Sequence, residues 1–394
     1  MRLGELLLDT FSGEWGTEEG ESLTPVLRTS NFNEDGSLDY STPAMRCIPE
    51  RKVAKKRMVR GDIILEKSGG TPKRPVGIMA FYDSDELALC SNFNQVLRFD
   101  EDRILPRFAF YQLRWLKDRN AFDRFTRKTT GLQNLQMKRL IELKLHVPQI
   151  EAQTMIADTL DKIVDNQRIL RREIIDLDLL VKSRFVEMFG DAGALMSRWP
   201  KMPLAACVNS IDSGKSVNCK SEARTGSAPG VLKLSALSSG KYLPEENKAM
   251  FDGESVLPGK EVMTGDILVA RKNTPDLVGT CVMVDCDVPN LMFPDLVFRM
   301  HPIAGVDGTY LSILLGQSSF SETVRSLAHG SAKSMSNIPK SELRKLEIPF
   351  PPLALQREFA NFVIDVDKLR FEAQKQKDEL QTLYDSLAQE YFAI

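Results

Sequence analysis

The sequence has few of the side chains that hold metal ions. It contains only three histidines, and its six cysteines show no CxxC spacing. A zinc site requires thiolate and imidazole ligands in tighter clusters than these. We therefore expect no metal centre in this chain and predict that its cysteines are buried, reduced thiols. These cysteines are Cys47, Cys90, Cys207, Cys219, Cys281 and Cys286.

Long apolar runs are also absent, and neither sign of charge dominates. No apolar stretch reaches the length of a membrane span, and the start, Met1 to Glu5, lacks the features of a signal peptide. The chain is therefore expected to be cytoplasmic and to bind no membrane. Its net charge is −2, and residues 1–150 carry 24 basic against 21 acidic side chains. This balance argues weakly against a strong non-specific DNA-binding protein.

A complete catalytic or phosphate-binding motif is missing as well. The segment Ser213-Gly214-Lys215-Ser216 resembles the end of a phosphate-binding loop, but Asn209 stands where the motif requires its first glycine. We predict a polar loop there. Asp62 lacks a second acidic residue at the spacing of a nuclease site and is predicted, like Asp266, to cap the turn before a strand. An enzyme is therefore not supported by the sequence.

What the chain does have is an internal repeat with a spacing of about two hundred residues. Residues 60–65, Arg-Gly-Asp-Ile-Ile-Leu, return at 264–269 as Thr-Gly-Asp-Ile-Leu-Val. Likewise Leu143-x-Leu145-x-x-Pro148, with Gln153 after it, returns as Leu346-x-Ile348-x-x-Pro351 with Gln356. Near-constant offsets over several segments indicate a duplicated architecture. Two similar surfaces suit a target made of two parts.

Each repeat begins as a mixed α and β region. Short β-like runs broken by Gly, Pro, Asn and Ser predict strands at 61–65 and 79–82, and again at 265–269 and 281–284. Helical patterns follow at 108–125 and 310–327. Each repeat is therefore predicted to be a unit in which strands are joined through turns and accompanied by a helix.

Each repeat ends in a long helix with a heptad pattern. Apolar positions alternate in steps of four and three, which is typical of helices that pack in a coiled coil. The two helices are expected to pair antiparallel with each other, to bind other chains, or to do both. Gln167 and Arg370 occupy equivalent polar slots, either as a buried pair that fixes register or at an exposed edge. The first pattern is Ile156, Leu160, Ile163, Gln167, Leu170, Ile174, Leu177, Val181, Arg184 and Met188, and the second is Phe359, Val363, Val366, Arg370, Ala373, Lys377, Leu380, Tyr384, Leu387 and Tyr391.

Together these features resemble the specificity subunit of type I restriction–modification enzymes. The resemblance rests on the strands at 61–65 and 265–269, the Val-Gly pairs that follow them at 76–77 and 278–279, and the segment 129–135. It rests above all on the duplicated Leu-x-Leu-x-x-Pro lead into a heptad helix. It spans essentially the whole chain. Each motif alone is weak, and their duplicated order is what makes the likeness specific.

The resemblance implies a fold class and a domain order. The fold would be mixed α/β, with two tandem α+β target-recognition domains, each followed by a long heptad helix, and with the helices forming an antiparallel coiled coil. The first domain would cover residues 1–150 and the second 191–350. The conserved helices would cover residues 151–190 and 351–394.

The resemblance also implies a function. Each target-recognition domain would read one half of a split, asymmetric double-stranded DNA site, and the helices would set the unread spacer between the half-sites. The helices would also hold two modification (methyltransferase) subunits, which restriction (translocase/endonuclease) subunits join. The chain itself would do no chemistry, and the sequence has no Asn-Pro-Pro-Tyr-like tetrad for amino-methylation. S-adenosylmethionine, ATP and Mg are expected in the partner subunits, with no cofactor in this chain.

Candidate DNA contacts are polar side chains in loops at equivalent places of the two repeats. Basic and hydroxyl groups suit phosphates, and Arg, Lys, Asn, Gln and Ser suit base edges. Solvated loops are the alternative for each of them. The candidates are Arg28, Ser30, Asn31, Lys67, Ser68, Lys73, Arg74, Lys128, Thr130, Gln133 and Asn134 in the first repeat, and Lys233, Ser235, Arg271, Lys272, Asn273, Lys333 and Ser334 in the second.

Two other classes of function remain open from the sequence. A duplicated protein-interaction adaptor, without DNA readout, is favoured slightly by the near-neutral charge and disfavoured by the loop chemistry. A stand-alone nuclease or methyltransferase lacks a complete motif. Salt-sensitive DNA binding by the assembled complex separates the first of these from a DNA-reading subunit.

Overall fold

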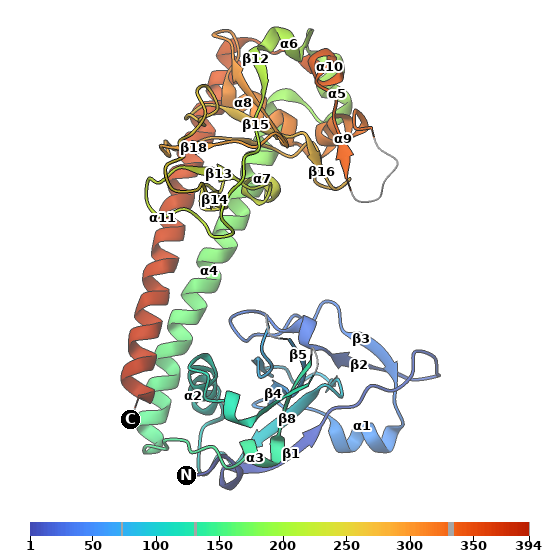
Figure 1. Cartoon of the computed structure of the whole chain (residues 1–394). Helices are drawn as coiled ribbons and strands as arrows, with labels where there is room; N and C mark the ends of the chain where they lie inside the picture. Colours follow the sequence, from blue (N-terminus) through green and yellow to red (C-terminus); the bar gives the residue numbers. More distant parts are fainter. Residues whose placement is uncertain (72–73, 130–131, 330–334, 394) are drawn as a thin grey trace. The chain divides into compact units, whose positions relative to one another are not determined.

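The computed structural model describes residues 1–71, 74–129, 132–329 and 335–393. It divides into two units (Figure 1). Unit 1 comprises Met1–Arg172 and Ala373–Ile394, and unit 2 comprises Glu173–Glu372. The two long helices are α4 (Ile150–Phe189) and α11 (Leu353–Phe392), and each contributes to both units. The units thus divide within the two long helices, which the sequence predicts as segments of their own at residues 151–190 and 351–394.

The core of unit 1 is an antiparallel sheet with strand order β1-β8-β4-β6. The central strand β4 is buried at every residue. Ile63 and Leu65 pack with the apolar side chains of α2, while Ile64 packs on the opposite face with Leu27, as the two-residue period of a strand requires. The strands are β1 (Leu7–Ser12), β8 (Asn94–Phe99), β4 (Ile63–Glu66) and β6 (Met79–Phe81), and the helix is α2 (Pro106–Asp118).

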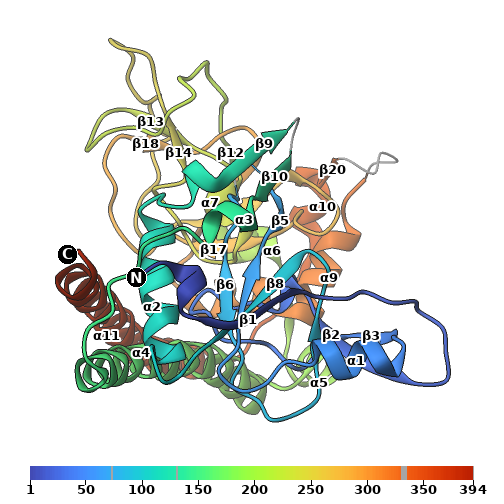
Figure 2. The same cartoon turned by 90° about the horizontal axis from the view of Figure 1, so that it is seen from below.

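Two smaller sheets complete unit 1. One has the order β3-β2-β7 and the other β5-β10-β9. Helix α1 lies beside β2 and β3 (Figure 2), where Val53 packs against a cluster that contains Val26 and Ile48. The strands are β2 (Leu23–Leu27), β3 (Ala44–Cys47), β7 (Leu89–Cys90), β5 (Ser68–Gly70), β9 (Thr126–Thr129) and β10 (Leu132–Leu135), and the short helices are η1 (Leu3–Glu5), η2 (Thr29–Asn31), α1 (Glu50–Lys56), η3 (Asp123–Phe125) and α3 (Met137–Leu140).

Unit 2 repeats the sheet order of unit 1, with β12-β19-β15-β17 as its main sheet. The predicted helix at 310–327 is in fact two helices, α8 and α9, which are separated by Gln317 in extended backbone. The strands are β11 (Lys201–Pro203), β12 (Val208–Ser213), β13 (Gly230–Leu232), β14 (Asn247–Ala249), β15 (Ile267–Ala270), β16 (Lys272–Asn273), β17 (Cys281–Met283), β18 (Leu291–Met292), β19 (Val297–Pro302), β20 (Ser336–Asn337) and β21 (Glu347–Pro349), and the helices are α5 (Ala192–Arg198), α6 (Leu204–Cys207), α7 (Ser235–Ser238), α8 (Gly308–Gly316), α9 (Ser318–Ser326) and α10 (Lys340–Lys345).

Repeated polar residues perform the same structural task in both units. Asp62 accepts a hydrogen bond from the Val59 N–H at 2.9 Å, and Asp266 accepts one from the Met263 N–H at 2.9 Å. Both carboxylates are buried, so the predicted capping of the turn before the central strand is confirmed.

The repeated glutamines fix the entry to the two long helices. Gln153 accepts a hydrogen bond from the Leu105 N–H at 2.7 Å and donates one to the Pro148 carbonyl at 2.9 Å. Gln356 does the same with the Asp307 N–H and the Pro351 carbonyl. Each glutamine therefore ties the start of a long helix to the start of the shorter helix that packs near it.

The heptad pattern correctly predicts which face of each long helix is covered. Every residue of the two patterns is buried or half-buried. Within unit 1, residues of α4 share an apolar cluster with Ala388 and Phe392 of α11. Within unit 2, Phe185 of α4 contacts Phe359 of α11, with ring centroids 5.5 Å apart. Among the residues proposed for helix packing, Ile156, Leu160, Ile163, Leu177, Phe359, Val363 and Val366 are buried, and Leu170, Ile174, Leu380 and Leu387 are half-buried.

The two polar slots of the pattern find partners within their own units. Gln167 donates a hydrogen bond to Gln381 at 3.2 Å in unit 1. In unit 2, Arg370 pairs with Asp178 at 2.7 Å. Gln167 and Arg370 therefore each hold the opposite helix at one place, rather than pairing with each other.

Helix α4 also anchors a loop and helix α2 of unit 1. Arg107 of α2 pairs with Asp161 at 2.6 Å, and α2 runs beside α4 in Figure 1. Asp35 pairs with Arg168 at 2.6 Å and accepts hydrogen bonds from the hydroxyl and N–H groups of Ser37. Burial raises the pKa of Asp35, but Arg168 and Ser37 outweigh it and bring the pKa down to about 2.

Asp35→Asn is expected to destabilise unit 1 at pH 7 by about 1–2 kcal/mol, after allowance for solvent screening of the partly exposed Arg168. Because the native pKa lies below the ordinary value of 3.8, this stabilisation is complete above roughly pH 4 and disappears as the pH falls toward 2. Urea unfolding at several pH values measures the difference. Asp165→Asn removes the more exposed partner of Arg168 and is the control. Equal effects of the two substitutions at pH 7 would contradict the prediction.

No described helix has the length and apolar character needed to cross a membrane. Across residues 1–71, 74–129, 132–329 and 335–393, no three His, Cys, Asp or Glu side chains gather as a metal-holding group. The cysteines are free thiols. Cys90, Cys207 and Cys281 are buried as predicted, whereas Cys47 and Cys219 are only half-buried and Cys286 is exposed. Burial raises the pKa of Cys90 and of Cys281 to about 12, so these two thiols are held in the unreactive protonated form.

Candidate nucleic-acid interface

One small sheet of unit 1 gathers candidates from two distant segments. Strand β10 pairs with β5 on one side and with β9 on the other, which places Asn134 opposite Ser68 and Gln133 opposite Lys128. Lys128 is exposed, Ser68 and Asn134 are half-buried, and Gln133 is only 7% exposed. Candidates that are distant in the sequence thus lie on one small sheet, although the Gln133 side chain is largely buried.

Unit 2 brings the matching segments together in the same way. Strand β16 pairs with β20, so that Lys272 faces Asn337 and Asn273 faces Ser336. Arg271 donates a hydrogen bond to the Asn337 side chain at 3.2 Å. Lys272 is half-buried and Asn273 is 9% exposed, with its amide oxygen accepting from the Thr274 N–H. Four further candidates, Lys73, Thr130, Lys333 and Ser334, lie outside the described residues.

The candidates that follow strand β2 differ in how far their side chains are exposed. Ser30 is exposed and Arg28 is half-buried. Asn31 is 1% exposed, accepts a hydrogen bond from the Arg28 N–H, and donates to the carbonyls of Asp39 and Thr42. Its amide is fully occupied in holding this loop, so in this conformation Asn31 has a structural role.

The matching positions in unit 2 meet at a single carboxylate. Lys233 pairs with Glu246 at 3.5 Å, and Ser235 donates a hydrogen bond to the same carboxylate at 2.6 Å. All three side chains are on the surface or close to it. A DNA phosphate approaching Lys233 would therefore compete with Glu246 for its ammonium group.

Lys67 and Arg74 follow the central strand of unit 1 and are both engaged. The Lys67 ammonium donates hydrogen bonds to Ser12 and, at 3.3 Å, to Gln95. Burial lowers its pKa. Arg74 has a half-exposed side chain and pairs with Glu66 at 3.2 Å. Lys67 therefore braces neighbouring strands, whereas Arg74 is accessible to a ligand.

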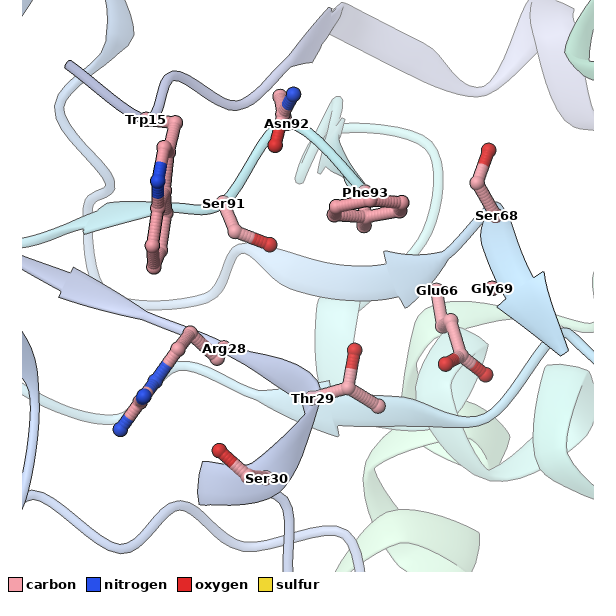
Figure 3. A pocket seen from close by; sticks show the side chains of 10 residues that line it. All are labelled: Trp15, Arg28, Thr29, Ser30, Glu66, Ser68, Gly69, Ser91, Asn92 and Phe93. Atoms are coloured by element: carbon pink, nitrogen blue, oxygen red, sulfur yellow. The ribbon is translucent and has the colours of Figure 1, made fainter.

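A pocket of about 350 Å³ opens among these segments of unit 1 (Figure 3). In Figure 3, Trp15 and Arg28 lie at one end and Glu66 and Ser68 at the other. Three of the predicted DNA contacts, Arg28, Ser30 and Ser68, line the pocket. Sequence reasoning missed the other seven lining residues, which are Trp15, Thr29, Glu66, Gly69, Ser91, Asn92 and Phe93.

The electrostatics of the pocket come from one acidic and one basic side chain. Glu66 is 2% exposed, and its Oε2 atom is buried with no hydrogen-bond partner. Burial raises the pKa of Glu66, and the charge of Arg74, together with hydrogen bonds from Arg74 and Thr29, offsets part of that rise. The Nε atom of Arg28 is likewise buried with no partner, although its Nη2 atom donates to the Thr42 carbonyl. Both atoms are enclosed by the protein, so neither faces the open space of the pocket.

The loop beside the pocket explains the glycine of the segment 213–216. The Gly13 N–H donates a hydrogen bond to the Asn94 carbonyl at the start of β8, and the Gly214 N–H donates one to the Val297 carbonyl at the start of β19. A Cβ atom would lie 2.1 Å from the Cys90 carbonyl oxygen at Gly13, and 2.1 Å from the Pro294 carbonyl oxygen at Gly214. Close backbone approach therefore requires glycine at both places, and Gly214 needs no phosphate to account for it.

Several apolar side chains remain exposed on the long helices. In the part of α4 that belongs to unit 2, Ile175, Leu179 and Val186 are 45–49% exposed and share one face by helical spacing. On α11 of the same unit, Ile364 and Phe371 lie seven residues apart and are 49% and 68% exposed. Exposed apolar groups of this size, repeated along one helix face, are typical of protein-binding surfaces.

Comparison with known proteins finds similarity to specificity subunits of type I restriction–modification systems. Residues 24–178 match the family model of the Type I restriction modification DNA specificity domain. The specificity subunit of the type I restriction enzyme EcoEI of Escherichia coli is 30% identical over 173 residues, which are 43% of this chain and 29% of that protein. The specificity subunit of the type I restriction enzyme MjaVIII of Methanocaldococcus jannaschii is 22% identical over 296 residues, 70% of this chain and 66% of that protein. The aligned parts thus span less than two thirds of these relatives.

Solved structures show the same fold. The S subunit of a type I restriction–modification system from M. genitalium gives a TM-score of 0.59 at 17% identity, covering 100% of this chain and 95% of that chain. A second structure, described as the structural basis underlying complex assembly and conformational transition of the type I R-M system, gives a TM-score of 0.53 at 18% sequence identity. The match covers 98% of this chain and 95% of that chain. The resemblance to type I specificity subunits that the sequence predicted is confirmed.

Proposed function

We propose, from the type I restriction modification DNA specificity domain at residues 24–178, that this chain is the DNA-reading subunit of a type I restriction–modification complex. In this proposal the chain is non-catalytic. It positions methyltransferase subunits, and the restriction subunits that join them, on a bipartite double-stranded DNA site in the cytoplasm. S-adenosylmethionine, ATP and Mg belong to those partners.

The observation that carries the proposal is the paired arrangement of polar loops. In each unit, the segment after the central strand pairs with a strand formed some sixty residues later, β5 with β10 and β16 with β20. The same fold thus presents equivalent surfaces whose side chains differ, as with Ser68 against Lys272. Two related surfaces of different chemistry support the reading of two different half-sites and hence an asymmetric target.

The long helices support the scaffolding part of the proposal. Their covered faces pack α4 and α11 together within each unit, and we infer an antiparallel coiled coil that also sets the unread spacer. The exposed residues Ile175, Leu179 and Val186 lie away from that covered face and offer an apolar surface to the methyltransferase subunits. We propose two such subunits, because the duplicated chain offers two similar environments.

Expression of this chain with a cognate methyltransferase subunit, in a host without DNA methylation, is expected to produce one split, asymmetric methylated motif. Long-read sequencing detects the motif across the genome. Arg271→Ala with Lys272→Ala is expected to change or weaken one half-site only, because both residues belong to unit 2. Omitting this chain is the control and should remove all methylation. An assembled, cofactor-binding complex that methylates no motif would overturn the proposal in favour of a protein-interaction adaptor.

A further inference from the structure

One connection of the repeated fold carries opposite charge in the two units. The sheets β3-β2-β7 and β14-β13-β18 have matching strand pairings, so the segments that lead from them to β4 and β15 are equivalent. In unit 1 this segment is residues 48–62, which carry six basic and two acidic side chains. In unit 2 it is residues 250–266, which carry one basic and four acidic side chains. Unit 1 therefore has a local basic feature in a chain whose net charge is −2.

The two segments also differ in backbone structure. Unit 1 forms helix α1 at Glu50–Lys56, whereas residues 250–266, a range that the structure describes in full, contain no helix. The basic side chains of unit 1 are thus held in a regular arrangement that unit 2 does not repeat.

Helix α1 is attached to unit 1 through the loop that carries Glu14 and Trp15. Val53 packs on the same apolar cluster as Trp15. Lys52 and Lys56, which lie one helical turn apart, both pair with Glu14, at 3.3 and 3.0 Å. These contacts use two of the basic groups of α1 to fix the helix in place.

This attachment places α1 at the edge of the candidate DNA surface. Trp15 lines the pocket together with Arg28 and Ser30, two of the predicted DNA contacts. The guanidinium of Arg46, in the neighbouring strand β3, lies 4.1 Å from the centroid of the Trp15 ring. The surface that contains Arg28 and Ser30 is therefore bordered by α1 and β3.

The face of α1 opposite Val53 presents basic groups to solvent. Arg51 and Lys55 are exposed and lie four residues apart, and the exposed Arg57 follows the helix. Within the part of the chain that the structure describes, no acidic side chain pairs with any of these three residues. Like charges at this helical spacing disfavour a helix, so an anion that contacts both Arg51 and Lys55 would relieve their repulsion.

The side chains of α1 suit a row of phosphates rather than base edges. The helix contains no Asn, Gln, Ser or Thr, so it has cations for phosphates and none of the uncharged side chains that read base edges. Double-stranded DNA carries one phosphate charge per roughly 1.7 Å of its axis, so its backbone can reach both exposed cations at once. An acidic protein surface would offer a similar charge, but the position of α1 beside Arg28 and Ser30 favours DNA.

Building on the function proposed above, we propose that α1 binds the DNA phosphate backbone through Arg51 and Lys55, and that unit 1 alone makes this contact. The acidic residues of the equivalent segment in unit 2 repel the backbone. Affinity for DNA of any sequence therefore comes mainly from unit 1. The two units differ in how strongly they hold DNA as well as in the half-site that each reads.

Arg51→Gln combined with Lys55→Gln, in the assembled complex, tests this contact. Binding is measured at several salt concentrations, to a duplex with the methylated motif and to an unrelated duplex. Each phosphate contact adds about 0.9 to the slope of log affinity against log salt concentration. We therefore expect the slope to fall by about 1.8, and both affinities to fall by the same factor, with the methylated motif unchanged. Glutamine has a helix propensity close to that of lysine and arginine, and circular dichroism verifies the fold.

Lys138→Gln combined with Arg139→Gln is the matched control. It also removes one lysine and one arginine, both exposed, from a helix of unit 1. That helix, α3, lies apart from α1 in Figures 1 and 2, so the slope is expected to stay as it is. An unchanged slope in the α1 variant would overturn the proposal, as would an equal fall in the control. A changed motif would show that α1 reads bases, and weaker subunit assembly with unchanged DNA binding would show that it binds an acidic protein surface.

Duplexes with phosphates neutralised as methylphosphonates locate the contact. The Arg271→Ala, Lys272→Ala variant described above identifies the half-site of unit 2. Neutral phosphates beside the other half-site are expected to weaken binding of the unaltered complex and to have little effect on the α1 variant. Equal sensitivity of the unaltered complex on both sides would overturn the asymmetry. Failure of the underlying function is distinct, because the unaltered complex would then have no methylated motif.

Discussion

Ile175→Glu combined with Leu179→Glu is expected to abolish assembly of the chain with methyltransferase subunits. Both side chains are nearly half exposed and lie one turn apart on the same face of α4. If a partner covers them, each loses roughly 1.5–3 kcal/mol of apolar burial on replacement. Two ionised carboxylates at the centre of the contact add a desolvation penalty. The combined loss corresponds to a decrease in affinity of about 100-fold or more.

Co-purification and analytical size exclusion measure this loss. Glutamate has a good helix propensity, so α4 is expected to stay folded, and circular dichroism of the free chain verifies that. Lys248→Glu in β14, an exposed position, changes the net charge by the same two units and is the matched control. A complex of unchanged size and affinity with the double variant would show that this helix face does not bind the methyltransferase.

Phe359→Ala is expected to destabilise unit 2 by about 3–5 kcal/mol, the usual cost of removing a fully buried aromatic ring. Phe359 is 0% exposed. Its ring meets Phe185 and Phe189 edge-on, with centroid distances of 5.5 and 5.4 Å, and both of those rings also contact Tyr310. The four rings join α4, α11 and α8, so the cavity left by alanine lies where three helices meet and has little room to collapse.

Trp199 provides a probe specific to this unit. Its indole N–H donates to the Phe189 carbonyl at 2.8 Å, and its ring packs against the same core. Urea unfolding followed by fluorescence in a Trp15→Phe, Trp115→Phe background therefore reports on unit 2, because both replaced tryptophans belong to unit 1. Phe371→Ala, on the same helix but 68% exposed, is expected to change stability by less than about 0.5 kcal/mol. A loss below 1 kcal/mol for Phe359→Ala would contradict the packing described here.

Features set by residues close together in the sequence were predicted well. The covered face of α4 follows from the spacing of residues such as Ile156, Leu160 and Ile163, because helix geometry alone places them together. The turns capped by Asp62 and Asp266 follow from local backbone chemistry and its duplication. These are local relations, and the sequence displays them directly.

The pocket could not be predicted because its walls come from four separate segments. Trp15, Arg28, Glu66 and Phe93 meet only through pairing of distant strands, and nothing in their spacing reveals it. The burial of Asn31 and Gln133 could not be predicted either, because both are polar residue types that commonly contact DNA, yet both lie inside the protein. The break between α8 and α9 was missed because their joint apolar pattern continues across Gln317.

The way unit 1 is assembled has a consequence for how the protein folds as it is synthesised. Its core contains Ala388 and Phe392 beside Phe108 and Trp115. Residues synthesised early therefore cannot complete their packing until residues nearly three hundred positions later have been synthesised. Unit 2, by contrast, is one continuous stretch of chain. Vectorial synthesis therefore lets the second unit close first, while the first leaves an apolar surface open until residues 373–393 emerge. The unit whose synthesis begins first is therefore the last to complete its core, and its apolar surface is exposed to aggregation in the interval.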